Sequence, residues 1–191
     1  MIVMIDIIGA MIAGTMVVMT IVNSIFNVQQ MNYNIQALLG LNTIANQVTE
    51  FIDLNYLESV GRNLASGDSV FVSAGINELV FYTKPSYADT NLTKFTITAL
   101  TNSSNQSYIS VNSGNTEVFN SLPFRIKNTD IFTYYDDKQL PIADLNNNLK
   151  KIFYIKVSLV FIEEGWDNRN DLVIEYPIVF WRFFKNIYLN I

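Results

Sequence analysis

The chain has 191 residues, of which 50% are hydrophobic and 15% are charged, and its formal net charge is −5. It contains no cysteine and no histidine. This excludes disulfides, thiol nucleophiles, zinc sites of the Cys/His type, His-ligated haem and histidine general bases. The basic residues begin only at Arg62 and are nearly matched by acidic residues from there on, which argues against nucleic acid as a partner.

Residues 1–27 form an apolar segment that starts MIVMIDIIGAMIAGTMVVMTIV and carries one acid, Asp6, with no further charge before Glu50. A run of about 20 apolar residues is long enough to cross a bilayer as a helix. A secretory signal would show a basic start and a clear break after the apolar run, and this segment has neither. We therefore expect residues 1–27 to be a membrane anchor. Asp6 is expected either to pair with a positive group or to lie solvated at the membrane edge.

Residues 28–66 have the pattern of an amphipathic helix that continues the anchor without a break. Apolar residues recur every three or four positions, which is the helical period: Val28, Met31, Ile35, Leu38, Leu41, Ala45, Val48, Ile52 and Tyr56. Gly61 is the expected stop signal, so the sequence predicts one helix from near Met1 to about Leu64. Its amphipathic part is expected to lie on a globular domain.

Residues 67–191 change to a period of two, which is typical of strands. The expected strands are SVFVSAG, NELVFYT, KFTITAL, QSYISVN, PFRIKN, DIFTYYDD, KKIFYIKVSLVFI and LVIEYPIVFWRFF. Pro177 in the last of these predicts an edge strand or a bulge. The expected fold class is α+β: a long N-terminal helix, apolar in its first half and amphipathic in its second, packed on a C-terminal antiparallel sheet.

The loops of this domain carry the candidate modification and metal sites. Asn91, Asn102 and Asn105 each begin an N-x-S/T triplet, a candidate glycosylation site that also arises by chance in Asn-rich chains. Acidic and amide residues at 136–137, 144–148 and 167–171 supply oxygen atoms suited to calcium, but none has EF-hand spacing, and turns are commonly rich in Asp and Asn. No metal or cofactor is expected.

The sequence offers no convincing catalytic group. Glu163 and Glu164 are adjacent in an expected strand, so their side chains point to opposite faces and make a poor acid–base pair. The aromatic residues Tyr134, Tyr135 and Trp181 are interpreted as packing residues. The chain is therefore not expected to be an enzyme.

The N-terminal segment resembles type IV pilin-like proteins, a class that includes the pseudopilins of type II secretion. The resemblance lies in an acid a few residues from the start, followed by an uncharged helix. It implies a leader removed by a prepilin peptidase, a mature first residue Met1 that is often methylated in the family, and an acid, here Asp6, that pairs with the N-terminal amine of a neighbouring subunit. The segment DIFTYYDDKQLPIADLNNNLKKIFYIKVSLVFIEE and the final RFFKNIYLN are similar to the C-terminal part of minor pseudopilin-like proteins.

The chain departs from the family pattern in several places. Asp6 stands where glutamate is usual, and the first residue is not Phe. The anchor has no proline, and the pair of cysteines near the end of many pilins is missing. These departures bear on the subtype of pilin rather than on the class.

The resemblance implies a structural subunit of a type IV pilus-like filament at the cell surface, with residues 1–27 as the filament core. The expected partners are identical copies in a helical filament, inner-membrane lipid before assembly, and the prepilin peptidase and pilus assembly machinery. The alternatives are a minor pseudopilin of a type II secretion-like machine and a monomeric membrane-anchored binding protein or adhesin.

Overall fold

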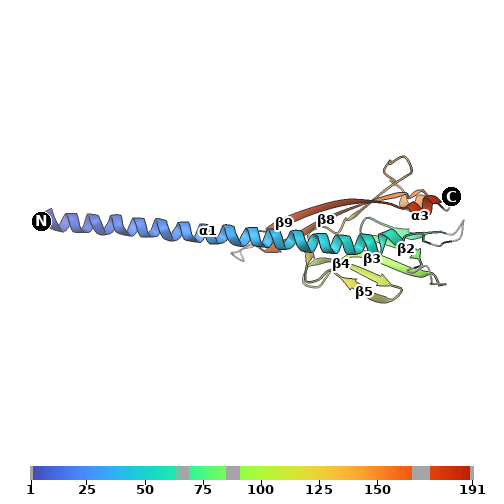
Figure 1. Ribbon diagram of the computed structural model, residues 1–191, viewed down its shortest axis with the longest axis horizontal. Coiled ribbons are helices and arrows are strands. Elements are labelled where there is room, and N and C mark those ends of the chain that lie inside the picture. The colour runs from blue at the N-terminus through green and yellow to red at the C-terminus, as the bar shows by residue number, and fades with distance from the viewer. Residues whose placement is uncertain (1, 63, 65–68, 85–90, 165–172, 190–191) are drawn as a thin grey trace.

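The computed structural model describes residues 2–62, 64, 69–84, 91–164 and 173–189. It has the expected α+β architecture: a long N-terminal helix, α1 (Ile2–Asn55), and a curled antiparallel sheet at the C-terminal side of the chain. The molecule is elongated, because the first half of α1 extends well beyond the sheet and places the N-terminus far from the domain (Figure 1).

Helix α1 is continuous over 54 residues, about 80 Å at 1.5 Å per residue. It contains no proline, and it runs unbroken through Gly9, Gly14, Thr20 and the Asn23–Ser24 pair. The α-helix ends earlier than the expected Leu64. A 3₁₀ turn, η1 (Leu57–Ser59), follows and buries Leu57, and Gly61 then takes a φ of +73°.

The described residues form nine strands in one sheet. The strands are β1 (Phe71–Ala74), β2 (Glu78–Thr83), β3 (Thr93–Thr101), β4 (Ser107–Ser113), β5 (Thr116–Asn120), β6 (Arg125–Ile126), β7 (Phe132–Tyr135), β8 (Tyr154–Glu164) and β9 (Val173–Phe183). The main order is β1-β2-β3-β4-β6-β8-β7, with β5 paired to β4 and β9 paired to β8. Every expected strand is present, and β5 is an addition that the sequence reading did not predict.

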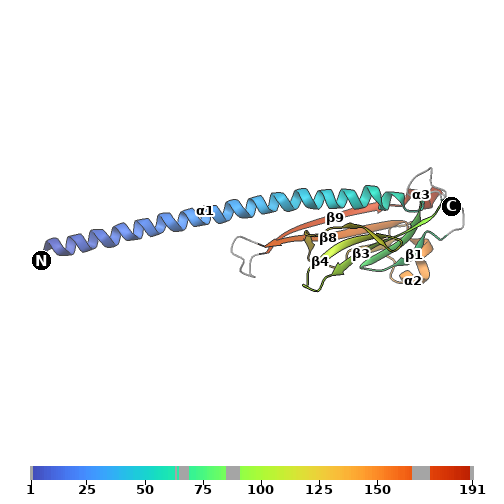
Figure 2. The ribbon, with the colours of Figure 1, turned by 90° about the horizontal axis from the view of Figure 1, so that it is seen from below.

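Three short helical segments complete the described fold: α2 (Leu145–Asn148), the 3₁₀ turn η2 (Leu149–Lys151) and α3 (Lys185–Leu189). Helix α3 follows β9 directly and lies at the end of the domain where α1 terminates (Figure 2).

Strand β9 is an edge strand, as Pro177 predicts. It pairs with β8 along 11 residues, with Val160 opposite Pro177, and it has no second strand neighbour among the described strands. A proline donates no backbone hydrogen bond, so it is tolerated at an open edge and discourages another strand from adding there.

The core lies between α1 and one face of the sheet (Figure 2). The helix contributes Leu41, Ala45, Val48 and Ile52, and Tyr56 follows its last residue; all five are buried. The alternation of residues 150–162 predicts one face made of Phe153, Ile155, Val157, Leu159 and Phe161. Strand β8 buries the last four of these, whereas Phe153 precedes the strand and is half-buried.

The domain covers only part of the amphipathic segment of α1. Val28, Met31, Ile35 and Leu38 belong to the apolar pattern but are 43–64% exposed, and the first fully buried helix residue is Leu41. Of the described strands, only the start of β9 reaches this part of α1, where Ile174 lines an open groove with Met31, Ile35 and Leu38 and leaves them largely exposed.

Candidate assembly surface

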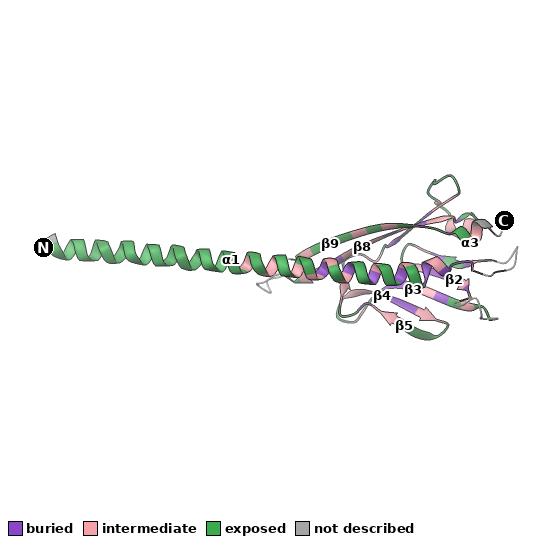
Figure 3. Ribbon diagram, viewed as in Figure 1, coloured by how far each residue is buried: buried purple, intermediate pink, exposed green. Residues whose placement is uncertain are grey.

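The projecting part of α1 is exposed on every side. Each residue from 3 to 29 is exposed (Figure 3), and the large apolar side chains of the segment, from Val3 to Val28, are 42–72% exposed. Among the described residues this is the one helix long and apolar enough to cross a membrane. So much apolar surface is far more than a soluble monomer normally exposes.

The hydroxyl groups of the projecting helix are satisfied within the helix itself. Thr15 donates to the carbonyl of Met11, and Thr20 donates to Met16 at 2.8 Å. Ser24 donates to the carbonyl of Thr20, also at 2.8 Å. These bonds remove the need for outside partners, so the segment is compatible with lipid or with another apolar helix.

Asp6 lies in the first turns of α1 and is exposed. No ion pair joins Asp6 to another described residue of its own chain, and the nearest basic residue in the sequence is Arg62. Met1, the expected partner from a neighbouring subunit, lies outside the described residues. The described residues of its own chain therefore offer the carboxylate of Asp6 no positive partner.

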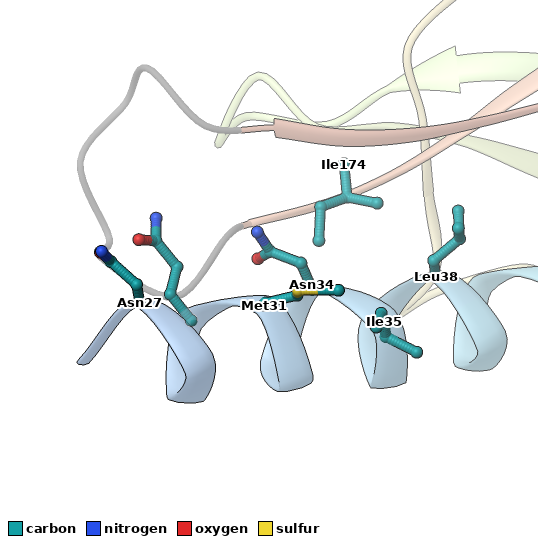
Figure 4. A pocket seen from close by; sticks show the side chains of 7 residues that line it. Asn27, Met31, Asn34, Ile35, Leu38 and Ile174 are labelled. Atoms are coloured by element: carbon teal, nitrogen blue, oxygen red, sulfur yellow. The ribbon is translucent and has the colours of Figure 1, made fainter. Parts of the chain in front are cut away.

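An open groove of about 410 Å³ marks the point where α1 leaves the domain (Figure 4). It is lined by Asn27, Gln30, Met31, Asn34, Ile35 and Leu38 from the helix and by Ile174 from the start of β9. The side-chain oxygen of Asn34 is buried and has no hydrogen-bond partner among the described residues. The groove mixes amide and apolar groups and carries no charge.

Polar contacts hold the docked half of α1 against β9. Arg182 makes two hydrogen bonds to the carboxylate of Asp53, one of them 2.6 Å from Nε to Oδ1. The Tyr176 hydroxyl donates to Asn42 Oδ1 at 2.9 Å. These residues are more than 120 positions apart, and sequence reasoning missed both pairs. The only signal was that Arg182 and Tyr176 occupy inward positions of an alternating strand.

The end of α1 is held by the C-terminal segment. The side-chain amide of Asn186 donates to the carbonyls of Glu58 and Val60 at 3.1 and 3.0 Å. A β-carbon added at Gly61 would lie 3.1 Å from Ile187 Cγ1. Together with the contacts to β9, this fixes the direction in which the projecting half leaves the domain.

The structure separates the three candidate glycosylation triplets. Asn105 is exposed at the tip of the β3–β4 turn, with φ of +58°. Asn102 is half-buried, and its amide nitrogen donates to Gln106 Oε1 at 3.2 Å while its oxygen accepts from two backbone N–H groups. Asn91 is exposed. Asn105 and Asn91 are therefore the accessible amides, whereas the amide of Asn102 is engaged in shaping its turn.

In the two described acidic loops, the carboxylates accept hydrogen bonds that shape turns. Asp136 Oδ1 accepts from the backbone N–H groups of Lys138 and Leu140, and Asp144 Oδ2 accepts from Asn147. The described residues hold no group of three acidic side chains arranged to bind a metal. The third cluster, 167–171, lies outside the described residues.

The aromatic residues interpreted as packing residues have two different environments. Tyr134 is buried, and its hydroxyl lies 2.9 Å from the carbonyl of Gly75, to which it donates. Burial raises the pKa of Tyr134 well above its ordinary value, although the hydrogen bond to Gly75 lowers it. Trp181, in contrast, is 53% exposed on the sheet surface that faces away from α1, which sequence reasoning did not anticipate.

No protein-family model, curated protein or solved structure matches the chain. The order of a long apolar N-terminal helix followed by an antiparallel sheet is consistent with a pilin-like fold.

Proposed function

We propose that this chain is the structural subunit of a type IV pilus-like filament, anchored in the inner membrane by α1 before assembly and packed on copies of itself through α1 afterwards. The observation that carries the proposal is the exposure of apolar side chains on all sides of residues 3–29, none of which the domain covers. Prepilin peptidase and a pilus assembly machinery are the partners that this function requires.

The cost of hydrating apolar side chains makes water unfavourable for residues 3–29 and favours either lipid or the helices of other copies. Removing one large aliphatic side chain from water contributes about 1.5–3 kcal/mol, and the projecting helix carries more than a dozen. Lipid and the helices of other copies both exclude water from these side chains. Moving the helix from lipid to protein therefore keeps its apolar surface dry throughout, and association then depends on packing and polar contacts.

Asp6 supplies the polar contact that fixes how neighbouring helices align. An apolar helix surface alone allows neighbours to slip past one another. A carboxylate that pairs with the N-terminal amine of the next copy favours one alignment, because removing one partner of a buried ion pair costs about 3–5 kcal/mol. The proposed pair joins Asp6 of one subunit to Met1 of its neighbour.

The test compares filament yield for Asp6→Ala, Asp6→Glu and Thr20→Ala. Asp6→Ala should give folded, membrane-inserted chain and few filaments, whereas Asp6→Glu should retain filaments because it keeps the charge. Thr20→Ala, which removes a polar group on the same helix without changing charge, is the control and should leave the yield unchanged. Yield is measured by electron microscopy of material sheared from cells, and a normal yield from Asp6→Ala would count against the proposal.

The same preparation distinguishes the alternative functions. Mass spectrometry of the sheared filaments would find this chain as the main component if it is the major subunit, and as a minor fraction if it is a minor pseudopilin. A chain recovered only as single molecules in the membrane would instead favour an anchored surface binding protein.

A further inference from the structure

The sheet surface that faces away from α1 carries a cluster of exposed side chains on β9 and half-buried ones on β7 and β8. Val179 and Trp181 are 52% and 53% exposed. The ring of Trp181 lies 4.6 Å from that of Tyr135, and Lys156 Nζ lies 5.8 Å from its centroid. Tyr154, on the same face, is the cross-strand partner of Tyr135. Phe183 pairs with Tyr154 across the strands, and their ring centroids lie 4.9 Å apart. We call Tyr135, Tyr154, Lys156, Val179, Trp181 and Phe183 the outer face. Such clusters of aromatic residues are typical of protein interfaces.

A second uncovered apolar surface lies on α1 between the anchor and the docked segment. Val28, Met31, Ile35 and Leu38, which we call the lower stripe, are 58%, 64%, 44% and 43% exposed. They recur every three or four residues and so share one side of the helix. Three of its four residues, Met31, Ile35 and Leu38, also line the open groove to which Ile174 contributes from the start of β9.

Lipid is a poor partner for both surfaces. The lower stripe is interleaved with amide side chains, namely Asn27, Gln29, Gln30, Asn32, Asn34 and Gln36, which are costly to place in hydrocarbon. The outer face contains Lys156 and belongs to an open sheet, whose edge backbone groups lipid cannot satisfy. In a single chain both surfaces therefore face water, so protein is the partner expected to cover them.

The two surfaces match each other in charge and length. The lower stripe lies in the stretch without charged residues between Asp6 and Glu50, and the outer face has a single charge, Lys156, to interact with the amide oxygens beside the stripe. Val28 to Leu38 spans about 15 Å at the helical rise. Val179 to Phe183 spans about 13 Å at the strand rise.

The outer face and the lower stripe lie at different positions along the axis of α1. Arg182, the neighbour of Trp181, is bonded to Asp53, whereas the lower stripe is centred near residue 33. Twenty residues of helix correspond to about 30 Å. Pairing the outer face with the lower stripe therefore joins two different surfaces of two copies with a shift along α1. Such a heterologous contact does not close into a dimer and repeats into a helical polymer.

We propose that the outer face of one copy packs on the lower stripe of the next, with a shift of about 30 Å along the helix axis. This inference rests on the proposed filament function and names the second contact, outside the membrane-spanning segment, by which subunits recognise each other. Trp181 and Val179 lie over Met31 and Ile35 of the neighbour.

Because the chain has no cysteine, the contact can be tested by introducing pairs of them. Val179→Cys with Ile35→Cys in one chain is treated with a short bis-maleimide cross-linker in intact filaments. A heterologous contact gives a ladder of covalent multimers, whereas each single variant gives no product larger than a dimer. The matched control replaces Ile35→Cys with Gln36→Cys, an exposed neighbour on another side of the helix, and should give at least tenfold less ladder.

A second measurement does not require the double variant. Ile35→Cys alone should react with a membrane-impermeant maleimide at least tenfold more slowly in filaments than in detergent-solubilised single chains. Gln36→Cys should react at similar rates in both.

Electron microscopy of the parent chain separates the two proposals. Filaments that give no ladder with Val179→Cys and Ile35→Cys, or an equal ladder with the control pair, overturn the inference and leave the filament standing. Equal labelling of Ile35→Cys in filaments and single chains also overturns it. Absence of both filaments and ladder overturns the inference together with the proposed function.

Discussion

The two halves of α1 are parts of one continuous helix with opposite relations to their own domain. Residues 3–29 are exposed throughout, whereas Leu41, Ala45, Val48 and Ile52 are at most 7% exposed beneath the sheet. The backbone is helical in both halves. The difference therefore lies entirely in what covers the side chains, and it teaches that the second half stabilises the monomer while the first half is available to lipid or to other copies.

The largest expected effect comes from matched alanine substitutions in the two halves. Ile52→Ala, at a position 2% exposed, should lower the free energy of unfolding by about 2–5 kcal/mol, because it leaves a cavity beneath the sheet. Ile12→Ala, at a position 52% exposed, should leave it unchanged in detergent. Urea unfolding of the full chain in detergent, followed by near-ultraviolet circular dichroism, measures both. Equal losses would contradict the division of α1 into two functional halves.

The next effect concerns the ion pair that docks α1 on β9. The side chains of Arg182 and Asp53 are 23% and 24% exposed. Arg182→Met should therefore cost about 1–3 kcal/mol by leaving a largely buried carboxylate unpaired, and adding Asp53→Asn should recover part of the loss.

The control for this pair is Lys127→Met. The side chains of Lys127 and Glu175 are 58% and 42% exposed, so the change should cost less than about 1 kcal/mol. A double-mutant cycle by urea unfolding gives the coupling energy, and a coupling no larger than that of the control pair would show that the ion pair does not hold the helix.

A smaller effect is expected where the docked half of α1 ends. Gly61 has a φ of +73°, and an added β-carbon would lie 3.1 Å from Ile187 Cγ1. Gly61→Ala should therefore cost about 1–2 kcal/mol, since both the backbone and the contact with α3 are strained. Gly114 has a φ of +60° with open space around it, so Gly114→Ala should lose only the part of the unfolding free energy that comes from backbone strain. Urea unfolding measures both variants. Equal losses of unfolding free energy would mean that the C-terminal segment shifts to accommodate the added methyl group and does not hold the end of α1.

The smallest expected change in the free energy of unfolding appears only at alkaline pH. It comes from Tyr134, in the domain on which the second half of α1 packs. Because the folded-state pKa of Tyr134 is raised, the unfolded chain releases this proton near pH 10 while the folded chain keeps it. Stability from this group is therefore fully present below about pH 10 and is lost above it, by up to about 1.4 kcal/mol per pH unit.

Tyr134→Phe tests this assignment. The variant should be about 1 kcal/mol less stable near neutral pH, where the hydrogen bond to Gly75 is lost, and should lose less stability between pH 10 and pH 11 than the parent chain. Urea unfolding at a series of pH values compares the two slopes. Parallel curves would assign the alkaline loss to other groups.

Much of the fold was predictable because its signals are local. The helical period, the absence of proline and the uncharged run predict α1, and the alternation in β8 correctly places Ile155, Val157, Leu159 and Phe161 in the core. Strand β5 was missed because its TEVFN segment is short and alternates only weakly, with no buried residue. The filament function, Asp6 with Met1 and the glycosylation triplets remain predictions, since a single chain contains no neighbour or glycan.

The sequence by itself determined that the chain has a helix too apolar for water followed by strands with one buried face, because backbone propensity and hydrophobic period depend on residues close in the chain. Only the tertiary structure decided where coverage of that helix begins, which residues clamp it, and that Trp181 is exposed. Burial of Leu41 and exposure of Leu38 depend on where the sheet ends, and the bond between Asp53 and Arg182 joins positions 129 residues apart. Such contacts arise from the three-dimensional path of the chain, so no local pattern in the sequence specifies them.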